Sequence, residues 1–439
     1  MASEGRGASP ALPPSATGGW TALALLLAFL GGLGLLRIGA VPGLGGNTVH
    51  AALFLIVLMG VAVAVVDLGV YRVHRRASTG MAPGHWAPSW ERTLHKFVGL
   101  LGSVGFVAWL YWLFPEYHGD FYGRYYELLK LILPPWLLLA LPYLYWVDAR
   151  MPKPQDGYWM LGRLLLMRRE GVDRARVWNH LLGWLVKGFF LPLMFTYMCN
   201  DLERFVRYDF AQLTAFRFVY DFLFGFLYFI DVGLVSLGYL MSLRATDTHL
   251  RSTEPSMLGW SVALLCYQPF WSLFDKQYLA YNAGNTWGQW LWNTPWLYGF
   301  WACLILLLTG LYVWATVVFG ARFSNLTHRG IITSGPYRFS KHPAYLAKNL
   351  SWWLISVPFL IGSDGSAAEA LRHCLLLLML NGVYFLRART EEAHLSRDAD
   401  YRAYAQWIAA HGLLARLRRG RPADAVPARA SDGEAMPQP

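Results

Sequence analysis

Residues 334–345 form the stretch SGPYRFSKHPAY, whose residue types and order suggest a binding site for a charged ligand. Arg338 and Lys341 bring positive charge to a Gly-Pro turn, and an apolar run follows at once. Pro343 has no backbone N–H, so it is expected to begin the helix formed by that run. His342 would then lie at the helix N-terminus, where free backbone N–H groups favour an anionic carboxylate or phosphate. The alternative is an ordinary turn at a membrane edge.

A second charged segment, YFLRARTEEAHL at residues 384–395, ends the last apolar run. Arg387 lies four residues before Glu391. Arg389 lies three residues before Glu392, so each pair has the spacing of neighbours on one helix face. Alone, such pairs are most often exposed salt bridges worth only a few tenths of a kcal/mol. Here they gather two cations and two carboxylates at the expected membrane surface.

Taken together, the two segments resemble a known family of membrane enzymes. The order GPYRxxKHPxY, a hydrophobic hairpin, RxRTEExxL and ADYRAYAQWI is similar to the membrane methyltransferases typified by isoprenylcysteine carboxyl methyltransferase, and to phospholipid methyltransferases. The similarity extends over about residues 320–415. The first motif departs from the family pattern at two positions, because Lys341 replaces the usual Arg and Ala347 replaces a common Gly.

The resemblance implies that the chain binds S-adenosylmethionine at the cytoplasmic face and receives a lipid or other hydrophobic small molecule from the bilayer. The residues then expected to contact the cofactor are Arg338, His342, Tyr345, Glu391 and Glu392. Those expected to act in catalysis, by orienting the acceptor's nucleophile or the cofactor carboxylate, are Arg387 and Arg389. Methyl transfer from a sulfonium mainly requires alignment and exclusion of water, so no metal ion is expected.

The elements that position these residues are expected to be membrane helices. Of the 439 residues, 55% are hydrophobic and only 15% are charged, which is unusual for a soluble protein. A helix that crosses a membrane needs about 20 apolar residues. The sequence therefore predicts an all-α polytopic membrane bundle of about ten transmembrane helices. They are expected near residues 20–39, 49–70, 97–114, 128–147, 181–199, 218–243, 257–274, 296–319, 344–362 and 370–388.

The basic residues are distributed unevenly between the two sides of this predicted bundle. When the connecting segments are assigned alternately to two sides, the set that includes both termini carries 28 Lys and Arg, and the other set carries 5. Positive residues concentrate in cytoplasmic loops. Both termini of this multi-pass membrane protein are therefore expected in the cytoplasm. The net charge of +11 is explained by topology and contact with membrane lipids, so no nucleic acid partner is expected.

Other residues suggest less chemistry. The four cysteines lack the spacing of a zinc site or a disulfide framework. Asp231 is the deepest carboxylate in the predicted helices, and it suits either a hydrogen-bonded interhelical contact or a substrate contact. Asp67 and Lys187 are expected near helix ends, where access to water suffices.

The chain is expected to divide into four parts. Residues 1–19 and 420–439 are rich in small and charged residues and are expected to be disordered tails. Residues 20–319 are expected to hold eight helices. Residues 320–419 are expected to form the methyltransferase-like hairpin and an amphipathic helix.

Two segments are predicted to be interfacial amphipathic helices, at 158–170 and 395–415. The second has an aromatic stripe that includes Tyr401 and Tyr404 and is followed by a basic patch. It suits either a lid over the site or a simple membrane anchor.

Two other functions remain open from the sequence. The helix number and the turn before residue 343 are also similar to the sterol reductases, which use NADPH, although Ala344 stands where those enzymes favour Asn. A transporter or scaffold with a degenerate hairpin would account for the long N-terminal region. Saturable binding of S-adenosylmethionine or of NADPH would separate these possibilities, since fold alone does not fix function.

Overall fold

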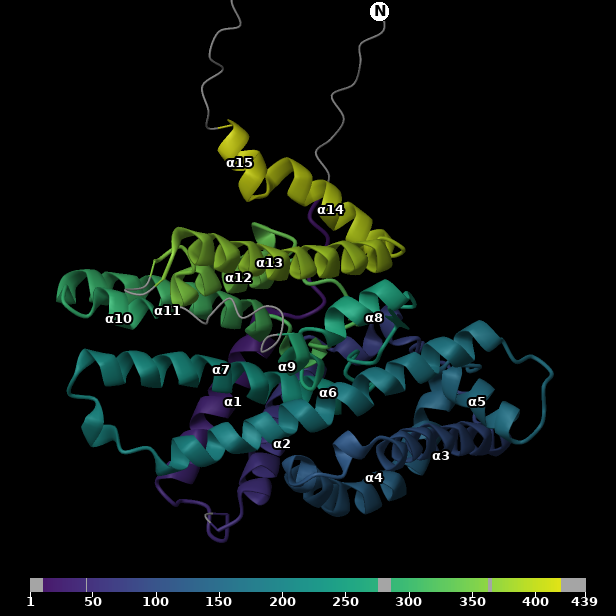
Figure 1. Cartoon of the computed structure of the whole chain (residues 1–439). Helices are drawn as coiled ribbons and strands as arrows, with labels where there is room; N and C mark the ends of the chain where they lie inside the picture. The colour runs from purple at the N-terminus through teal and green to yellow at the C-terminus, as the bar shows by residue number, and fades with distance from the viewer. Residues whose placement is uncertain (1–10, 45, 275–285, 362–364, 420–439) are drawn as a thin grey trace, which may run out of the picture.

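The computed structural model describes residues 11–44, 46–274, 286–361 and 365–419, so most of the predicted terminal tails lies outside the described residues. Its regular structure is almost entirely helical, which confirms the expected all-α bundle (Figure 1). The helices are α1 (Gly19–Arg37), α2 (Thr48–Val65), α3 (Trp90–Leu113), α4 (Gly123–Arg150), α5 (Gly157–Leu165), α6 (Arg174–Arg207), α7 (Phe216–Leu240), α8 (Met257–Leu264), α9 (Phe270–Phe274), α10 (Trp287–Leu291), α11 (Pro295–Val317), α12 (Pro343–Ser356), α13 (Ala367–Leu395), α14 (Ala399–His411) and α15 (Leu413–Arg419). One short ribbon pairs β1 (Ser252–Thr253) with β2 (Thr327–His328).

Eight helices of the described chain are long and apolar enough to cross a membrane, by length and composition. They are α1, α2 with its π-helical extension to Val70, α3, α4, α6, α7, α11 and α13. The described residues thus contain such a helix at eight of the ten predicted runs. The run at 257–274 contains two short helices, α8 and α9, and the run at 344–362 contains α12, which has 14 residues.

The shorter helices in these two runs have a local cause in the backbone. Pro269 precedes α9 and offers no N–H to a helix arriving from α8. Val357 ends α12 in a left-handed conformation with φ 37°, and Pro358 disfavours a helical conformation of the residue before it. Hydropathy measures apolar character and does not detect such breaks.

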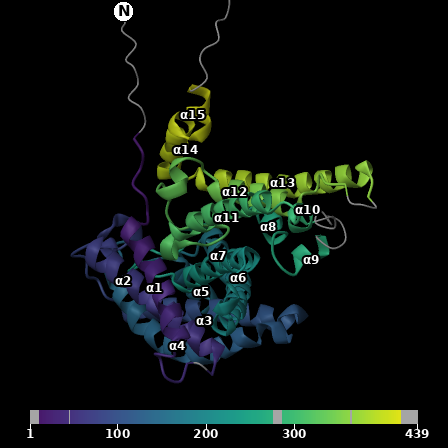
Figure 2. The ribbon, with the colours of Figure 1, turned by 90° about the vertical axis from the view of Figure 1, so that its left-hand side faces the viewer.

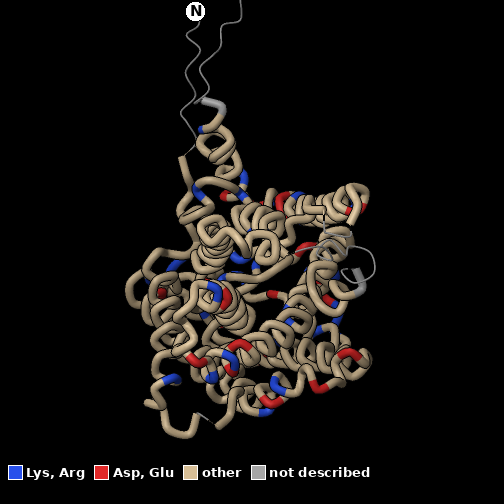
Figure 3. Tube along the Cα trace, turned by 60° about the vertical axis from the view of Figure 1, so that its left-hand side comes forward, with Lys and Arg blue, Asp and Glu red and all other residues tan. Residues whose placement is uncertain are grey.

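The helices are arranged in layers. Figures 1 and 2 show α6 and α7 between the group α11–α13 and the group α3–α5, while α14 and α15 extend from the far side of α11–α13. The largest buried apolar cluster draws mainly on α1, α2, α6 and α7. Charged residues are sparse along most of the helices (Figure 3). This apolar body holds the α12–α13 hairpin on one side.

Helix α5 lies directly against α3, and two glycines permit the approach. A Cβ atom at Gly99 would lie 1.9 Å from the carbonyl oxygen of Tyr158, and one at Gly162 would lie 1.7 Å from that of His95. The segment predicted as an interfacial helix at 158–170 is thus shorter than expected, and one face packs on protein. Backbone contact across paired glycines is a common way for membrane helices to approach closely.

Residues 13–17, predicted as part of a disordered tail, contact the C-terminal region instead. The Ala16 N–H donates a 2.9 Å hydrogen bond to the Ile331 carbonyl oxygen. The Thr333 hydroxyl donates a 2.9 Å hydrogen bond to the Pro13 carbonyl oxygen. These bonds join the start of the described chain to the turn that precedes α12.

Two ionisable residues predicted near helix ends lie in other environments. Asp67 is buried, accepts a 2.5 Å hydrogen bond from the Thr21 hydroxyl and lies 3.8 Å from the Arg322 guanidinium. Lys187 lies near the middle of α6. Asp67 thus lies near the end of the α2 extension, as predicted, but it is buried and does not rely on access to water. Lys187 is not near a helix end, so that part of the prediction is wrong.

Candidate functional site

The two charged segments identified in the sequence meet at one end of the hairpin formed by α12 and α13. His342 Nε2 donates a 2.9 Å hydrogen bond to Glu392, and the Lys341 ammonium lies 2.7 Å from the same carboxylate. The Tyr345 hydroxyl donates a 2.9 Å hydrogen bond to Glu391. These contacts join residues as much as 50 positions apart in the sequence. The start of α12 and the end of α13 therefore form one site.

The turn before α12 delivers His342 to this site. Gly335 has φ +57°, and a Cβ atom there would lie 2.7 Å from Val318, so the turn requires glycine. Pro343 occupies the first turn of α12, as predicted. His342 is the N-cap residue, but its side chain makes no capping hydrogen bond and instead contacts Glu392.

Arg387 lies at the centre of the site and is 7% exposed. It donates a 2.5 Å hydrogen bond to the side-chain oxygen of Asn325, and its guanidinium carbon lies 5.2 Å from the ring centre of Tyr345. Asn325 also donates hydrogen bonds to the hydroxyls of Tyr239 (2.9 Å) and Tyr267 (3.1 Å). Among the described residues, no carboxylate forms an ion pair with Arg387. Its guanidinium is thus available to an anionic or polar ligand.

Lys348 is one turn beyond Tyr345 on α12, and aromatic rings surround its ammonium. The Nζ atom lies 5.2, 5.4 and 5.9 Å from the ring centres of Tyr312, Trp352 and Tyr384, respectively. Cation–π contacts of this kind partly offset the cost of burying an ammonium. Lys348 therefore faces protein and not lipid.

Asp231 lies on α7 and forms hydrogen bonds with two residues of α11. Its carboxylate accepts 2.6 Å hydrogen bonds from the hydroxyls of Tyr312 and Thr316 on α11. Tyr312 and Thr316 line the cavity, while Asp231 lies behind them. The structure thus has the interhelical contact that was one of the two interpretations of Asp231.

Tyr345, Lys348 and Arg387 are among the residues that line a cavity of about 150 Å³, which α14 covers on one side. The Tyr404 hydroxyl donates a 2.6 Å hydrogen bond to the Tyr337 carbonyl oxygen, and Tyr401 is buried next to it. The predicted amphipathic segment at 395–415 thus contains a helix whose aromatic side chains face the cavity. This placement matches the lid interpretation of the segment.

Several buried polar atoms around the cavity have no hydrogen-bond partner in the described chain. They are His328 Nε2, His394 Nδ1, the Tyr401 hydroxyl, Thr327 Oγ1, Glu254 Oε2 and Arg322 Nε. Buried polar groups are normally hydrogen-bonded. Their concentration around one cavity points to a polar ligand with several donors and acceptors.

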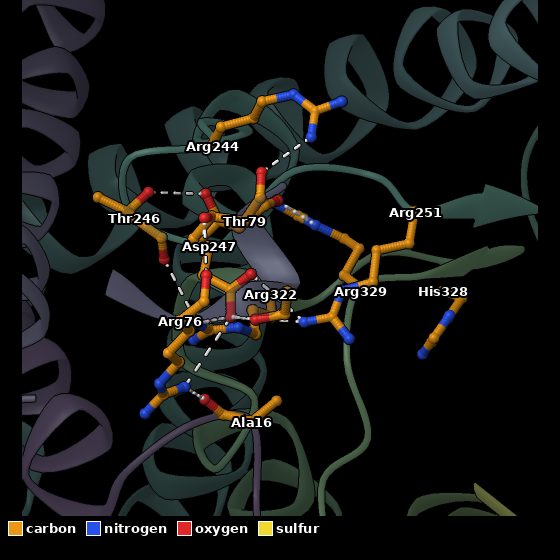
Figure 4. A network of polar contacts seen from close by, with 12 residues as sticks. Ala16, Arg76, Thr79, Arg244, Thr246, Asp247, Arg251, Arg322, His328 and Arg329 are labelled. Atoms are coloured by element: carbon orange, nitrogen blue, oxygen red, sulfur yellow. Dashed lines mark hydrogen bonds and ion pairs between the residues drawn. The ribbon is translucent and has the colours of Figure 1, made fainter. Parts of the chain in front are cut away.

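Two arginines that line the cavity belong to a buried polar network (Figure 4). Arg329 donates hydrogen bonds to the carbonyl oxygens of Thr248 (2.7 Å) and Gly238 (2.6 Å). Arg322 lies 3.6 Å from the Asp247 carboxylate. Burial, aided by repulsion from Arg322, lowers the pKa of Arg329 to about 9, so its guanidinium remains mostly charged at pH 7. The network attaches the loop after α7 to the site.

The structure separates the predicted site residues into two groups. Those that line the cavity are His342, Tyr345, Arg387 and Glu391. Glu392 lies behind this wall, where it holds Lys341 and His342. Arg338 is exposed, and Arg389 has 67% of its side chain exposed; neither lines the cavity. The roles of all seven residues stay predictions.

The sequence analysis missed Asn325 and Tyr267 as members of the site. Asn325 follows α11 in the loop ARFSNLTHRG, where nothing in the spacing distinguishes it from its polar neighbours. Tyr267 lies between two short helices in a run that was predicted to be a single span. The only available signal was the concentration of polar residues directly after the apolar run of α11.

The hydrogen-bonded motifs and the hairpin between them also lie in the part of the chain that matches the model of a known protein family. No curated protein and no solved structure matches the chain. The identified part begins within α11 and ends just after α13, so it omits α14, which the predicted similarity had included. This match supports a membrane methyltransferase and does not favour the reductase or the scaffold. Residues 300–397 match the model of the isoprenylcysteine carboxyl methyltransferase (ICMT) family.

Proposed function

We propose that the chain transfers a methyl group from S-adenosylmethionine to a lipid or other hydrophobic small molecule at the cytoplasmic face of the membrane. One observation carries the proposal: the two family motifs are hydrogen-bonded to each other through His342–Glu392 and Tyr345–Glu391 around a single cavity. An ordinary turn at a membrane edge would not need hydrogen bonds to the far end of the hairpin.

The cavity residues fit the chemical groups of S-adenosylmethionine. The carboxylates of Glu254 and Glu391 suit a ligand with a positive sulfonium and an ammonium. The unpartnered Tyr401 hydroxyl and the ring nitrogens of His328 and His394 suit its ribose hydroxyls and amino-acid group. Glu391 already accepts a hydrogen bond from Tyr345, whereas Glu254 Oε2, His328 Nε2, His394 Nδ1 and the Tyr401 hydroxyl would gain the hydrogen-bond partner that they lack within the described chain.

The proposed reaction makes modest demands on the protein. When bound, S-adenosylmethionine supplies a methyl group on a positive sulfur, and the acceptor bonds to that carbon as the carbon–sulfur bond breaks and sulfur keeps the electron pair. Arg387 would orient a polar or anionic atom of the acceptor through its free guanidinium donors. Tyr267, Tyr345 and Tyr384 would exclude water from that position.

Admission of the cofactor requires the cavity to open. Its volume of about 150 Å³ is below the range of roughly 300–1,000 Å³ that is common for ligand sites. Helix α14 covers the cavity with Tyr401 and Tyr404, and it is joined to the turn by the Tyr404–Tyr337 hydrogen bond. We therefore expect α14 to move outward when ligands enter and leave.

Calorimetry of the full chain in detergent against S-adenosylhomocysteine and NADPH, in parallel, tests the proposal. We expect saturable binding of S-adenosylhomocysteine and none of NADPH. Binding of NADPH alone would replace the proposed function with that of a reductase. Binding of neither ligand would favour the scaffold.

A matched pair of variants on α13 tests the site itself. Glu391→Gln removes a cavity carboxylate and should weaken S-adenosylhomocysteine binding by about 1–3 kcal/mol, the usual range for a lost buried polar partner. Glu369→Gln removes an exposed carboxylate at the other end of α13 and keeps a side chain that can maintain the capping box. It should leave affinity unchanged. Equal affinities for the two variants would remove Glu391 from the site.

A further inference from the structure

A second cavity, which we call the N-terminal cavity, lies outside the region that matches the family. It has a volume of about 760 Å³ and is lined by residues from α3 to α7 and from the loop after α7. This volume is in the range of sites that bind small molecules, roughly 300–1,000 Å³. The methyltransferase function proposed above assigns no role to it.

Part of the N-terminal cavity is strongly basic. Its charged lining residues are the cations Lys96, Arg176, Lys187, Arg244 and Arg251 and the carboxylate Asp156. Asp156 is already paired, at 3.4 Å from the Lys96 ammonium and 3.7 Å from the Arg244 guanidinium. Burial opposes ionisation of Asp156, but Lys96 and Arg244 outweigh it and lower its pKa. Of the other cations, Lys96 also lies 3.0 Å from Asp148, Arg176 lies 3.6 Å from Asp173 and Arg251 lies 3.3 Å from Asp247. Lys187 is therefore the lining cation that has no carboxylate partner among the described residues.

Lys187 is the lining cation whose positive charge is least balanced by negative groups of the described chain. It lies near the middle of α6, a helix long enough to cross a membrane, and it lines the cavity. Its ammonium lies 5.5 Å from the ring centre of Trp184 and makes no hydrogen bond or ion pair with any described residue. An ammonium at such a position is costly without an anion. The cavity offers space for an anion from outside the chain.

The rest of the N-terminal cavity is apolar and reaches the outer surface of α4. Its apolar lining residues include Leu100, Trp136, Leu139, Ala140, Leu144 and Trp184. Trp136 is 39% exposed and Leu139 is 65% exposed, on a helix that the composition places in hydrocarbon. This wall would be accessible to an acyl chain from the bilayer.

We propose that the N-terminal cavity binds a lipid with a net anionic phosphate headgroup. The phosphate would pair with Lys187 and Arg244, and an acyl chain would lie along the α4 wall (Figure 4 shows Arg244 and Arg251 at the loop after α7). A small soluble anion would leave the apolar wall uncovered. A lipid without net charge would bring no net negative charge to Lys187.

The proposal does not depend on the methyltransferase function. Thr253 of β1 lines the N-terminal cavity, and its ribbon partner Thr327 of β2 lines the other cavity. Residues of the two neighbouring strands thus line different cavities. Lipid binding can be measured on protein that binds no S-adenosylhomocysteine, so failure of one proposal is distinguishable from failure of the other.

Native mass spectrometry of the full chain, delipidated in detergent, tests the headgroup. Phosphatidate and phosphatidylcholine with identical acyl chains are titrated separately, and phosphatidate is also titrated with an excess of inorganic phosphate. We expect phosphatidate to bind at least about tenfold more tightly, as charge-assisted contacts of 1.5–3 kcal/mol imply. Inorganic phosphate should not displace it. Equal affinity for the two lipids, or displacement by inorganic phosphate, would overturn the proposal.

Matched substitutions test the position of the headgroup. Lys187→Met should remove most of the preference for phosphatidate, and Lys187→Arg should keep it. Lys130→Met removes an exposed lysine of α4 that does not line the cavity and should change nothing. An unchanged preference in Lys187→Met would contradict the proposal.

A measurement on the unsubstituted chain covers the case in which Lys187→Met fails to fold. Phosphatidate with a photoreactive diazirine in its acyl chain should label the segment 136–144 of α4 or the facing part of α6. Labelling confined to other helices would show that the bound lipid lies elsewhere and would overturn the assignment.

Discussion

His342 and Glu392 were predicted as separate contacts to a cofactor, but the structure shows that they contact each other. Glu392 also lies 2.7 Å from Lys341 and does not line the cavity. We therefore expect Glu392 to act as a positioning residue, which holds the turn so that His342 and its neighbours face the cavity. Glu391, which lines the cavity and accepts from Tyr345, is the carboxylate placed to meet a ligand.

This arrangement predicts that His342 and Glu392 act as a unit. His342→Ala and Glu392→Gln should each weaken S-adenosylhomocysteine binding, but the double variant should lose less than the sum. Residues in one hydrogen-bond network usually show coupling of about 0.5–3 kcal/mol. Calorimetry on the three variants measures this coupling, and additive losses would mean that the 2.9 Å contact does not organise the site.

At the level of helices, the sequence predicted the hairpin because its signals are local. Pro343 marks the start of α12, and the charged residues after the last apolar run mark the end of α13. The length of α12 was not predictable from hydropathy, since its end depends on the conformation of Val357. The role of Asn325 was not predictable either, because it depends on Tyr239, Tyr267 and Arg387 meeting in space.

The contact between α3 and α5 gives a prediction with an internal control. Gly99→Ala places a Cβ atom 1.9 Å from the Tyr158 carbonyl oxygen, so the two helices must separate. Gly105→Ala, also on α3, meets nothing within 4 Å. In thermal melts, Gly99→Ala should lower the Tm. Gly105→Ala should preserve or raise it, because alanine favours a helix over glycine by about 1 kcal/mol. Similar melting temperatures would mean that the helices are not in backbone contact.

The β1–β2 ribbon should make stability depend on pH. Burial lowers the pKa of His328 in β2 to about 4, with repulsion from Arg251 and His394 adding to the effect and Asp398 opposing it. The unfolded chain, with an ordinary histidine pKa near 6.5, binds more protons between about pH 4 and 6.5. Stability should therefore fall as the pH falls through this window, by up to about 3 kcal/mol from this group.

Thermal melts between pH 7 and pH 4.5 measure this effect. His328→Gln should reduce the loss of Tm on acidification, because it removes the group that takes up a proton on unfolding. His118→Gln, at an exposed histidine, should leave the loss unchanged. If His328→Gln melts with the same pH dependence as the parent chain, the acid sensitivity arises elsewhere.

At the scale of the whole molecule, the uneven distribution of basic residues predicts the orientation in the membrane. In a background without the native cysteines, cysteine substitutions at Gly84 and Ser396 should be protected from an impermeant reagent added outside intact cells. A substitution at Asp120, in the set of loops with few basic residues, should be labelled. Labelling of Ser396 would place the site on the outer side and remove it from the cytoplasmic supply of S-adenosylmethionine.

The hydrogen bond between Pro13 and Thr333 joins residues 320 positions apart, so its two partners are synthesised at different times. At a synthesis rate of about 5–20 residues per second, residues 13–17 would wait roughly 16–64 seconds for their partners to leave the ribosome. During that time the Pro13 carbonyl oxygen and the Ala16 N–H lack their partners at Thr333 and Ile331. A chain that terminates before residue 331 never buries this segment, so it presents an extended N-terminal sequence to proteases.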